Sequence, residues 1–224
     1  MQEFSVLNTF AVPIITRKIA GAEAANAALR KAILAREASD PGMKRSNADG
    51  WHSEQTLLTW PEIEGTGLRG WIDEGARQVA RIALRDPNKA VDIGYEAQGW
   101  ANVNRHGNYN MAHTHPGAQW SMVYYVDMGV PEQDHRLNGI FEFRDPRQRA
   151  IEFPGFDFGR SINIVPEAGL FLAFPAWIEH MVHPFYGTGE RISIAINLRF
   201  TKFQFRDLSP AERQALPMPA AGAV

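Results

Sequence analysis

The chain has 224 residues, a formal net charge of −2 and 45% hydrophobic residues, which is the composition of an ordinary soluble globular protein. Its charged residues are mixed without a basic block, and it has no cysteines. We therefore expect no nucleic-acid partner, no disulfide, no thiolate metal site and no cysteine nucleophile. No signal-peptide pattern and no apolar stretch of about 20 residues is visible, so we expect a cytoplasmic protein without membrane contact.

The N-terminal part of the chain carries the helical signals. Residues 1–15 could form an opening strand, residues 17–37 are Ala-rich and predict a helix, and a second helix is predicted over residues 68–85. Residues 38–58 between the helices are polar and turn-rich, and Asp86-Pro87-Asn88 ends the second helix. The predicted buried stripes are Ile19, Ala22, Leu29 and Ile33 in the first helix, and Trp71, Ile72, Val79, Ile82 and Ala83 in the second.

After residue 90 the pattern changes to short alternating segments punctuated by Gly, Pro, Asn and Asp, which predicts strands. The predicted strands are 95–103, 108–115, 119–127, 139–144, 161–165, 169–174, 181–185 and 190–200. Short strands after two helices predict a mainly β chain with N-terminal helices (α+β), arranged as a β-sandwich or jelly roll. We expect one domain over 1–224, with a helical part (1–90) packing on a β core (91–207), and a tail (208–224) that frays.

The predicted strand ERISIAINLRF has two different faces. Arg191, Ser193, Ala195, Asn197 and Arg199 share one face, because side chains alternate along a strand. The other face is aliphatic or aromatic at every position and must be covered, most simply by the N-terminal helices. The polar face is therefore expected to line a wet or charged space.

A candidate metal site is visible in the histidines. His113-Thr-His115 lies in a predicted strand, so both imidazoles are expected on one face, where they could bind the same metal. His180, just beyond the buried strand that ends at Pro175, is the best third ligand, and neutral imidazole suits Fe, Zn, Cu and Ni. Of the other histidines, His106 and His135 are expected in solvent and His183 at a rim.

Arg191 follows His180 by eleven positions, and Ser193 is two further on. On one strand face a guanidinium and a hydroxyl can bind a single carboxylate, and Arg does so with two parallel charge-assisted hydrogen bonds. Beside a metal site, this pair predicts an acidic co-substrate.

The pattern His…His-x(10)-Arg-x-Ser resembles the Fe(II)/2-oxoglutarate oxygenase superfamily, over about residues 100–200. The segments HTHPGAQWSMVYYVD (113–127) and PEAGLFLAFPAWIEHMVHPF (166–185) resemble prolyl-hydroxylase-like members, and the likeness is strongest to a bacterial group of oxygenases with uncharacterised substrates. SN…GWHS, a DPR triplet (145–147) and RISI…N also match that group.

The resemblance implies a double-stranded β-helix (jelly roll) that holds Fe(II), binds 2-oxoglutarate as co-substrate and hydroxylates a small-molecule or peptide substrate with O2. The implied catalytic residues are His113, His115, His180 and Arg191, with the three histidines as metal ligands. Arg191, Ser193 and Tyr125 would hold the far carboxylate of 2-oxoglutarate. Asn197 is assigned with them to the cofactor site, which Asn102 and Asn104 could also line.

One departure from the superfamily concerns the second ligand. Most members have HxD or HxE, which completes a facial triad of two histidines and one carboxylate; here that position is His115. The site either has three histidine ligands, which we favour, or takes a carboxylate from elsewhere. The available carboxylates are Glu142, Asp145, Asp127 and Glu179. In the N-terminal part, Trp51 and His52 could touch substrate or serve only to pack a turn.

Two other functions remain possible from the residues alone. A cupin-like enzyme or sensor also uses HxH and a later histidine, without 2-oxoglutarate, but with a glutamate where this chain has Gln119 or its neighbours. A non-catalytic binding module is the second alternative. Arg191 with Ser193 argues against both. The sequence does not name the substrate and does not fix the oligomeric state, a homodimer being one option.

Overall fold

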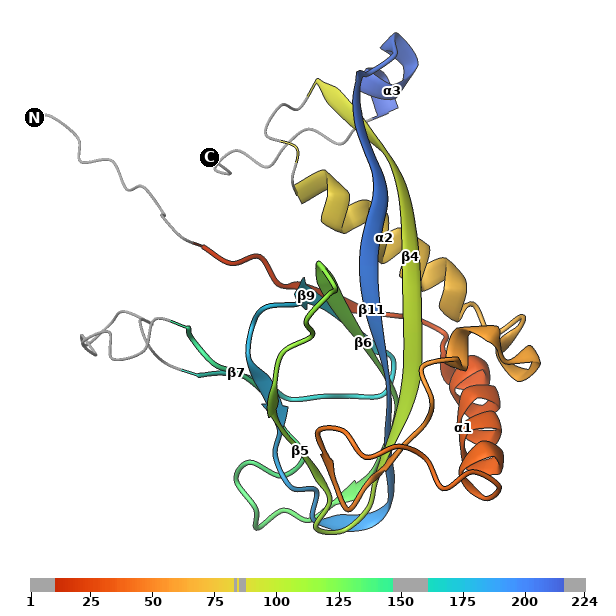
Figure 1. The fold of residues 1–224 in the computed structure, drawn as a ribbon, viewed down its shortest axis with the longest axis vertical. Helices are drawn as coiled ribbons and strands as arrows, with labels where there is room; N and C mark the ends of the chain where they lie inside the picture. The colour runs from red at the N-terminus through yellow and green to blue at the C-terminus, as the bar shows by residue number, and fades with distance from the viewer. Residues whose placement is uncertain (1–10, 83, 85–87, 147–160, 216–224) are drawn as a thin grey trace, which may run out of the picture.

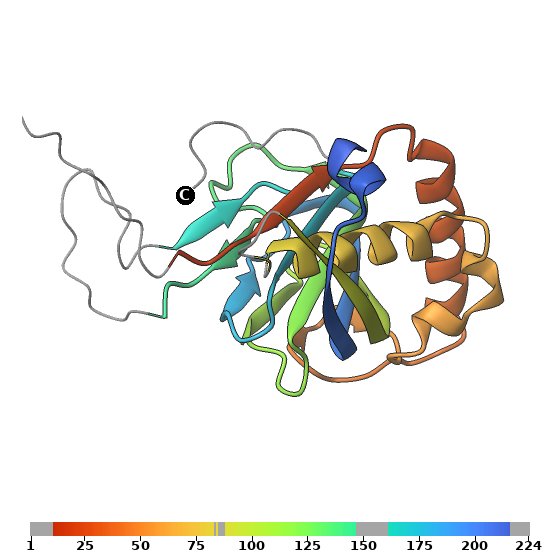
Figure 2. The ribbon, with the colours of Figure 1, turned by 90° about the horizontal axis from the view of Figure 1, so that it is seen from above.

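Two antiparallel sheets face each other, and two long helices cover the outer side of the larger sheet (Figures 1 and 2). The computed structural model describes residues 11–82, 84, 88–146 and 161–215. The larger sheet has the order β1 (Ile15–Lys18), β9 (Leu170–Pro175), β6 (Trp120–Pro131), β11 (Gly187–Asp207), β4 (Lys89–Asn104) and β3 (Trp51–His52). The smaller sheet has the order β2 (Asn47–Ala48), β5 (Tyr109–His113), β10 (His180–Val182), β7 (Phe141–Phe143) and β8 (Ile162–Ile164).

The helical segments are α1 (Glu23–Glu37), α2 (Leu68–Ile82) and α3 (Pro210–Ala215), with two 3-10 turns, η1 (Leu57–Thr59) and η2 (Pro61–Ile63). This is the mainly β architecture with N-terminal helices that the sequence predicts. Among the described residues, no helix has the length and apolar character needed to span a membrane.

Strand β11 divides the core into two parts, as its alternation predicts. Its aliphatic face, represented by Ile194 and Ile196, is fully buried against α1 and α2. Its polar face looks into the space between the sheets, where a second cluster contains Tyr125, Phe141 and Phe174. The helices therefore cover one side of the large sheet and leave the other side for the site.

The predicted helix over 17–37 is wrong at its start. Residues Ile15–Lys18 form β1, which pairs with β9, and Gly21 has a φ of 67°, so the helix begins only at Glu23. A residue in this left-handed region interrupts a right-handed helix. The predicted stripe Ile19, Ala22, Leu29 and Ile33 is nevertheless buried.

Helix α2 packs tightly on the large sheet. A Cβ at Gly75 would lie 2.9 Å from the Phe171 ring, so glycine permits this approach. Ile72 and Val79 are buried as predicted, whereas Ile82 is 40% exposed because the helix ends there, at the rim of its contact with the sheet. Ala83 and Asp86-Pro87 lie outside the described residues.

The turn-rich segment after α1 contains two short strands that the sequence does not predict. β2 pairs with β5 of the small sheet, and β3 pairs with β4 of the large sheet. The two strands are joined by Asp49, at φ 60°, and Gly50. The β2–β3 segment therefore connects the two sheets, and it brings His52 opposite Asn102.

The two longest strands exceed their predicted bounds. β4 begins at Lys89 and β11 ends at Asp207, and they pair with each other along this whole length. A register shift between Phe200 and Lys202 interrupts the alternation in β11. The predicted strand ends near this shift, because a bulge reverses the faces and hides the period of two.

Candidate metal centre

Three histidines converge between the sheets. His113, the last residue of β5, is the direct cross-strand partner of His180, the first residue of β10. His115 lies two residues beyond the end of β5, in the turn that contains Pro116 and Gly117, and its backbone N–H donates to Ala176. The prediction that His115 lies in a strand is therefore wrong. One potential ligand atom of each histidine nonetheless lies within 4.8 Å of the others.

Backbone carbonyls fix the orientation of two imidazoles. Nδ1 of His113 is 2.7 Å from the Met111 carbonyl, and Nδ1 of His180 is 2.9 Å from the Ile178 carbonyl. A carbonyl only accepts, so each Nδ1 carries the proton and the neutral ring keeps its lone pair on Nε2. This is the arrangement that commonly orients histidines toward a metal.

The spacing and charge of the rings fit a cation. Nε2 of His115 is 3.2 Å from Nε2 of His180, and two nitrogens about 2.1 Å from one ion lie roughly 3.0–3.4 Å apart at usual ligand angles. Burial lowers the pKa of all three rings, to about 4 for His115 and well below the ordinary value for His180. The rings are therefore neutral and available as ligands.

The surroundings of the centre are apolar on the small-sheet side. The ring of His180 stacks on Phe141 at 5.2 Å between centroids and meets Phe174 edge-on at 4.8 Å. On the large-sheet side, Trp100 lies 5.6 Å from His115. These rings exclude water from the back of the site.

The described carboxylates do not join the three histidines. Glu142 is on the opposite face of the small sheet from His180, because its partner there is Met181, and it binds His183 at 2.6 Å. Asp127 bonds Arg30 of α1 on the outer side. Among described residues, the group able to hold a metal consists of the three histidines. Glu179 bonds Arg144 at 3.1 Å.

The remaining histidines lie away from this centre. His183 is half-buried in its contact with Glu142, while His106 and His135 lie near Glu132 and are largely exposed, as expected. Asp145 precedes residues outside the described part of the chain, which include Arg147 of the DPR triplet.

Arg191 lies deep in the space between the sheets, without a charged partner in the described part of the chain. Its side chain is 1% exposed, its Nε donates to the Gly139 carbonyl at 3.1 Å, and both terminal nitrogens lack a hydrogen-bond partner among the described residues. Gly139, at φ 61°, allows this approach, since a Cβ there would lie 3.3 Å from Cδ of Arg191. A buried guanidinium without a counter-charge is costly, so this position calls for an anion.

Two hydroxyls accompany Arg191. Ser193 is buried and directly opposite Tyr125 on β6, and the guanidinium of Arg191 lies 5.4 Å from the centroid of the Tyr125 ring. The Tyr125 hydroxyl is buried and has no partner among the described residues. Burial raises the pKa of Tyr125 to about 12, although the nearby Arg191 acts against this rise, so the phenol stays protonated and can donate.

The predicted asparagines occupy different parts of the inner face. Asn102 is opposite Ser193, and Asn104 is opposite Arg191 and donates to Asn110 at 3.0 Å. Asn197 lies four residues beyond Ser193, about 13 Å along the strand, and its Oδ1 accepts from Ser121 at 3.0 Å. Asn197 is thus well separated from Arg191.

The β2–β3 segment contributes one side chain to the inner face. His52 is buried, its Nδ1 donates to the Ser53 carbonyl at 2.6 Å, and its ring stacks on Trp100 at 5.5 Å. Trp51 instead bonds Asp40 through its indole N–H. Sequence reasoning missed Trp100, although it shares the period-two face of Asn102 and could have been found by that signal.

The donors present fit Fe(II) and 2-oxoglutarate. Three neutral imidazoles could hold a metal, and Arg191 and Tyr125, whose buried polar atoms lack partners among the described residues, could donate to an acidic molecule. A five-carbon keto-diacid has one carboxylate for the donors and a keto-acid end for the metal.

Comparisons with known proteins agree with this chemistry. Residues 98–197 match the model of the family described as "Putative 2OG-Fe(II) oxygenase". A comparison with the sequences of curated proteins found no match. Similar folds include a Pseudomonas putida prolyl-4-hydroxylase, with a TM-score of 0.57 and 15% identity, covering 84% of this chain and 92% of that one.

Two further structures share the fold. The Trichoplax adhaerens prolyl hydroxylase in complex with a hypoxia-inducible-factor peptide has a TM-score of 0.56 and 11% identity, covering 83% of this chain and 82% of that one. The epimerase SnoN in complex with Fe3+, α-ketoglutarate and nogalamycin RO has a TM-score of 0.61 and 12% identity, covering 94% and 88%.

Fold and family match together define a 2-oxoglutarate-dependent oxygenase. Residues 98–197 match the 2OG-Fe(II) oxygenase family, whose cofactors are Fe(II) and 2-oxoglutarate, and the fold is the double-stranded β-helix of the similar structures. These predictions from the sequence are confirmed.

Proposed function

We propose that His113, His115 and His180 bind the Fe(II), that Arg191, Ser193 and Tyr125 bind the far carboxylate of 2-oxoglutarate, and that the enzyme hydroxylates a C–H bond of its substrate. The observation that carries this proposal is Arg191, a buried guanidinium whose terminal nitrogens lack partners within the described ranges of the chain. When bound, Fe(II) and 2-oxoglutarate would supply the oxidising chemistry, in which the substrate, O2 and 2-oxoglutarate are converted to the hydroxylated substrate, succinate and CO2.

The residues of the chain hold and orient the reactants. Arg191 and Tyr125 donate hydrogen bonds in a space from which Phe141 and Phe174 exclude water, and such charge-assisted bonds are strong at low dielectric. The Nδ1–H groups of His113 and His180 donate to their carbonyl partners, so both rings keep a fixed direction. The chain thus contributes binding and orientation rather than proton transfer.

A three-histidine set differs from the commoner triad in charge. Without a carboxylate ligand, the metal centre keeps one more unit of positive charge, which favours an anionic keto acid as the next ligand. The positions of Glu142 and Asp127, each bound elsewhere and facing away, support three histidine ligands. Asp145 retains its own interactions and is not assigned to the metal.

The main alternative is a cupin-like enzyme or sensor that does not use 2-oxoglutarate. It would have no use for a buried cation beside the metal, and the family match argues against it.

The test is an anaerobic visible spectrum of the protein with Fe(II) and 2-oxoglutarate. Chelation of the metal by the keto acid gives a weak charge-transfer band, which we expect in the wild type. It should be lost in His180→Ala, and it should need much higher co-substrate concentrations in Arg191→Ala. Metal binding without any such band would favour the cupin-like alternative.

For the partners, we propose O2 and a small-molecule or peptide substrate, with a homodimer as one option for the oligomeric state. We also propose a cytoplasmic location, since a chain without cysteines suits a reducing compartment. A bacterial origin stays a prediction from the resemblance.

A further inference from the structure

The inner face of the large sheet is a series of cross-strand rows. Register pairing aligns Asn104 with Arg191, then Asn102 with Ser193, Trp100 with Ala195, and Gln98 with Asn197. Successive rows are two residues apart, or roughly 7 Å. Burial falls along this series, from the buried Arg191 to the exposed Gln98, so the mouth of the site is at the Gln98 end.

The metal centre lies near the middle of these rows. The ring of Trp100 is 5.6 Å from His115, so the histidines face the Trp100 row. A co-substrate that reaches from the metal to Arg191 occupies the rows on the buried side. The row of Gln98 and Asn197 lies on the other side of Trp100, away from the co-substrate. It is therefore available to bind the molecule that is oxidised.

A polar cavity of about 260 Å³ lies at this position. Two amide side chains, Gln98 and Asn197, line it together with the ion pair Glu96 and Arg199, and the turn that follows His115 forms its remaining wall at Gly117. Cavities for drug-sized ligands measure about 300–1,000 Å³. This one is smaller and fits a compact polar molecule.

The charges of the cavity are complementary to a zwitterion. Arg199 Nη2 lies 2.6 Å from Glu96 Oε2, and both side chains are more than half exposed, so the pair is readily opened by a ligand. A carboxylate can then bind Arg199 and an ammonium Glu96. Oδ1 of Asn197, which lines the cavity, accepts from Ser121, and its amide NH2 group can serve as a donor to a ligand.

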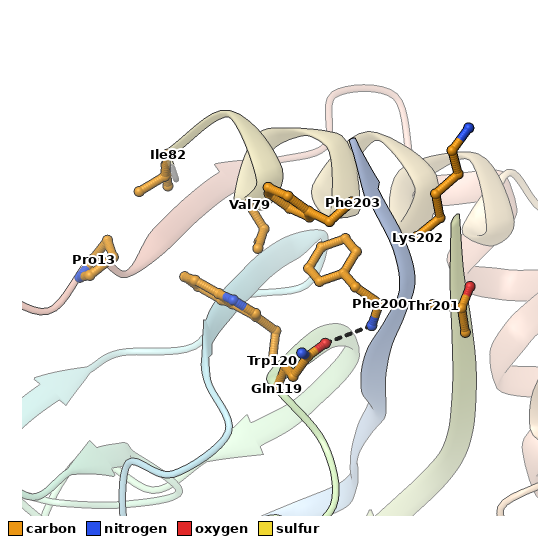
Figure 3. Close-up of a pocket in the computed structure, with 9 residues that line it drawn as sticks. All are labelled: Pro13, Val79, Ile82, Gln119, Trp120, Phe200, Thr201, Lys202 and Phe203. Carbon is orange, nitrogen blue, oxygen red and sulfur yellow. Dashed lines mark hydrogen bonds between the residues drawn. The ribbon is translucent and has the colours of Figure 1, made fainter. Parts of the chain in front are cut away.

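A larger cavity is a weaker candidate for substrate. It measures about 520 Å³ and is lined by Trp120, Phe200 and Val79 among others (Figure 3). These residues belong to the outer side of the large sheet, against α2. The sheet therefore separates this cavity from the three histidines.

We propose that the cavity lined by Glu96, Gln98, Asn197 and Arg199 binds the primary substrate and that the substrate is a free amino acid or a similarly sized zwitterion. This inference rests on the proposed function, because the position of the metal gives the cavity its role. It also reassigns Asn197 from the co-substrate to the substrate.

The test uses saturation-transfer NMR with the full chain, once metal-free and once with Zn(II), a diamagnetic substitute, and 2-oxoglutarate. The probes are a mixture of the proteinogenic amino acids and, separately, the same residues as N-acetyl amides, which lack both charges. We expect signals from one or more free amino acids and none from their blocked forms. Glu96→Gln and Arg199→Gln should each weaken binding about tenfold or more, the loss typical of a hydrogen bond to a charged group.

The matched control is Arg206→Gln, which removes another exposed, ion-paired arginine of β11 far from the cavity and should leave binding unchanged. The proposal is overturned if no free amino acid binds, if blocked and free forms bind equally, or if both cavity variants bind like the wild type. Failure of the proposed function would appear separately, as absent metal uptake.

Discussion

His113 and His180 face each other directly across two neighbouring antiparallel strands, with their ring centroids 4.4 Å apart. The backbone of the small sheet therefore sets the distance between these two histidines, whereas His115 joins them from a turn. We expect about one metal ion per chain, and we expect His113→Ala and His180→Ala each to lose most of it. Elemental analysis after gel filtration measures this.

His135→Ala is a suitable control for the metal prediction, because His135 is a largely exposed loop residue near Glu132. It should keep the wild-type metal content. Full occupancy in both ligand variants would disprove the assigned centre.

Arg191 should dominate the binding of 2-oxoglutarate. Removing one partner of a buried charge pair typically costs about 2–5 kcal/mol, so Arg191→Ala should weaken binding by roughly one and a half orders of magnitude or more. Anaerobic calorimetric titration measures the affinity, and elemental analysis should find the metal retained. If Arg191→Ala bound 2-oxoglutarate as tightly as the wild type, the result would favour a cupin-like enzyme.

The same residue should make the ligand-free protein less stable than it could be. Arg191 is fully buried without a counter-charge among the described residues, and replacing buried ionic groups by apolar ones of similar volume is often neutral or stabilising by about 1–4 kcal/mol. Arg191→Met should therefore unfold at an equal or higher denaturant concentration than wild type without ligand. A clear loss of stability would show that the guanidinium is already compensated.

His115 tests the ligand set. His115→Asp recreates the commoner triad and replaces a neutral donor with an anionic one, so it should keep iron, whereas His115→Ala should bind it more weakly. Metal titration compares the two. Wild-type iron affinity in His115→Ala, together with lost affinity in Glu142→Gln, would instead assign the third ligand to Glu142.

Two glycines of helix α2 with different surroundings allow a test of how the helix packs on the sheet. Gly75→Ala places a methyl group 2.9 Å from the Phe171 ring and should destabilise the protein by about 1–3 kcal/mol through overpacking. Gly70→Ala, in the same helix with open space around it, should instead stabilise by about 0.5–1 kcal/mol. Urea unfolding measures both, and equal effects would contradict the close packing of α2 on the sheet.

The sequence predicted those features that have a regular period or a specific residue pattern. The faces of β11 were predicted from the alternation around Ser193, and the histidine pattern predicted that His113, His115 and His180 lie together. Strands β2 and β3 were missed because two-residue strands have no readable period. His115 reaches the centre from a turn, through a bond to Ala176 that no local pattern encodes.

Strand β11 fixes the distance between two residues of the site. Ser193 and Asn197 lie on one unbroken stretch that is paired on both sides, with β4 and with β6. Their separation, about 13 Å, is therefore a property of the backbone and not of flexible side chains. A one-residue insertion between them would move the Asn197 side chain to the other face of the strand, which packs in the aliphatic layer beneath α1 and α2. Evolution of new specificity can exchange the residues on this strand, but it cannot change their spacing in small steps.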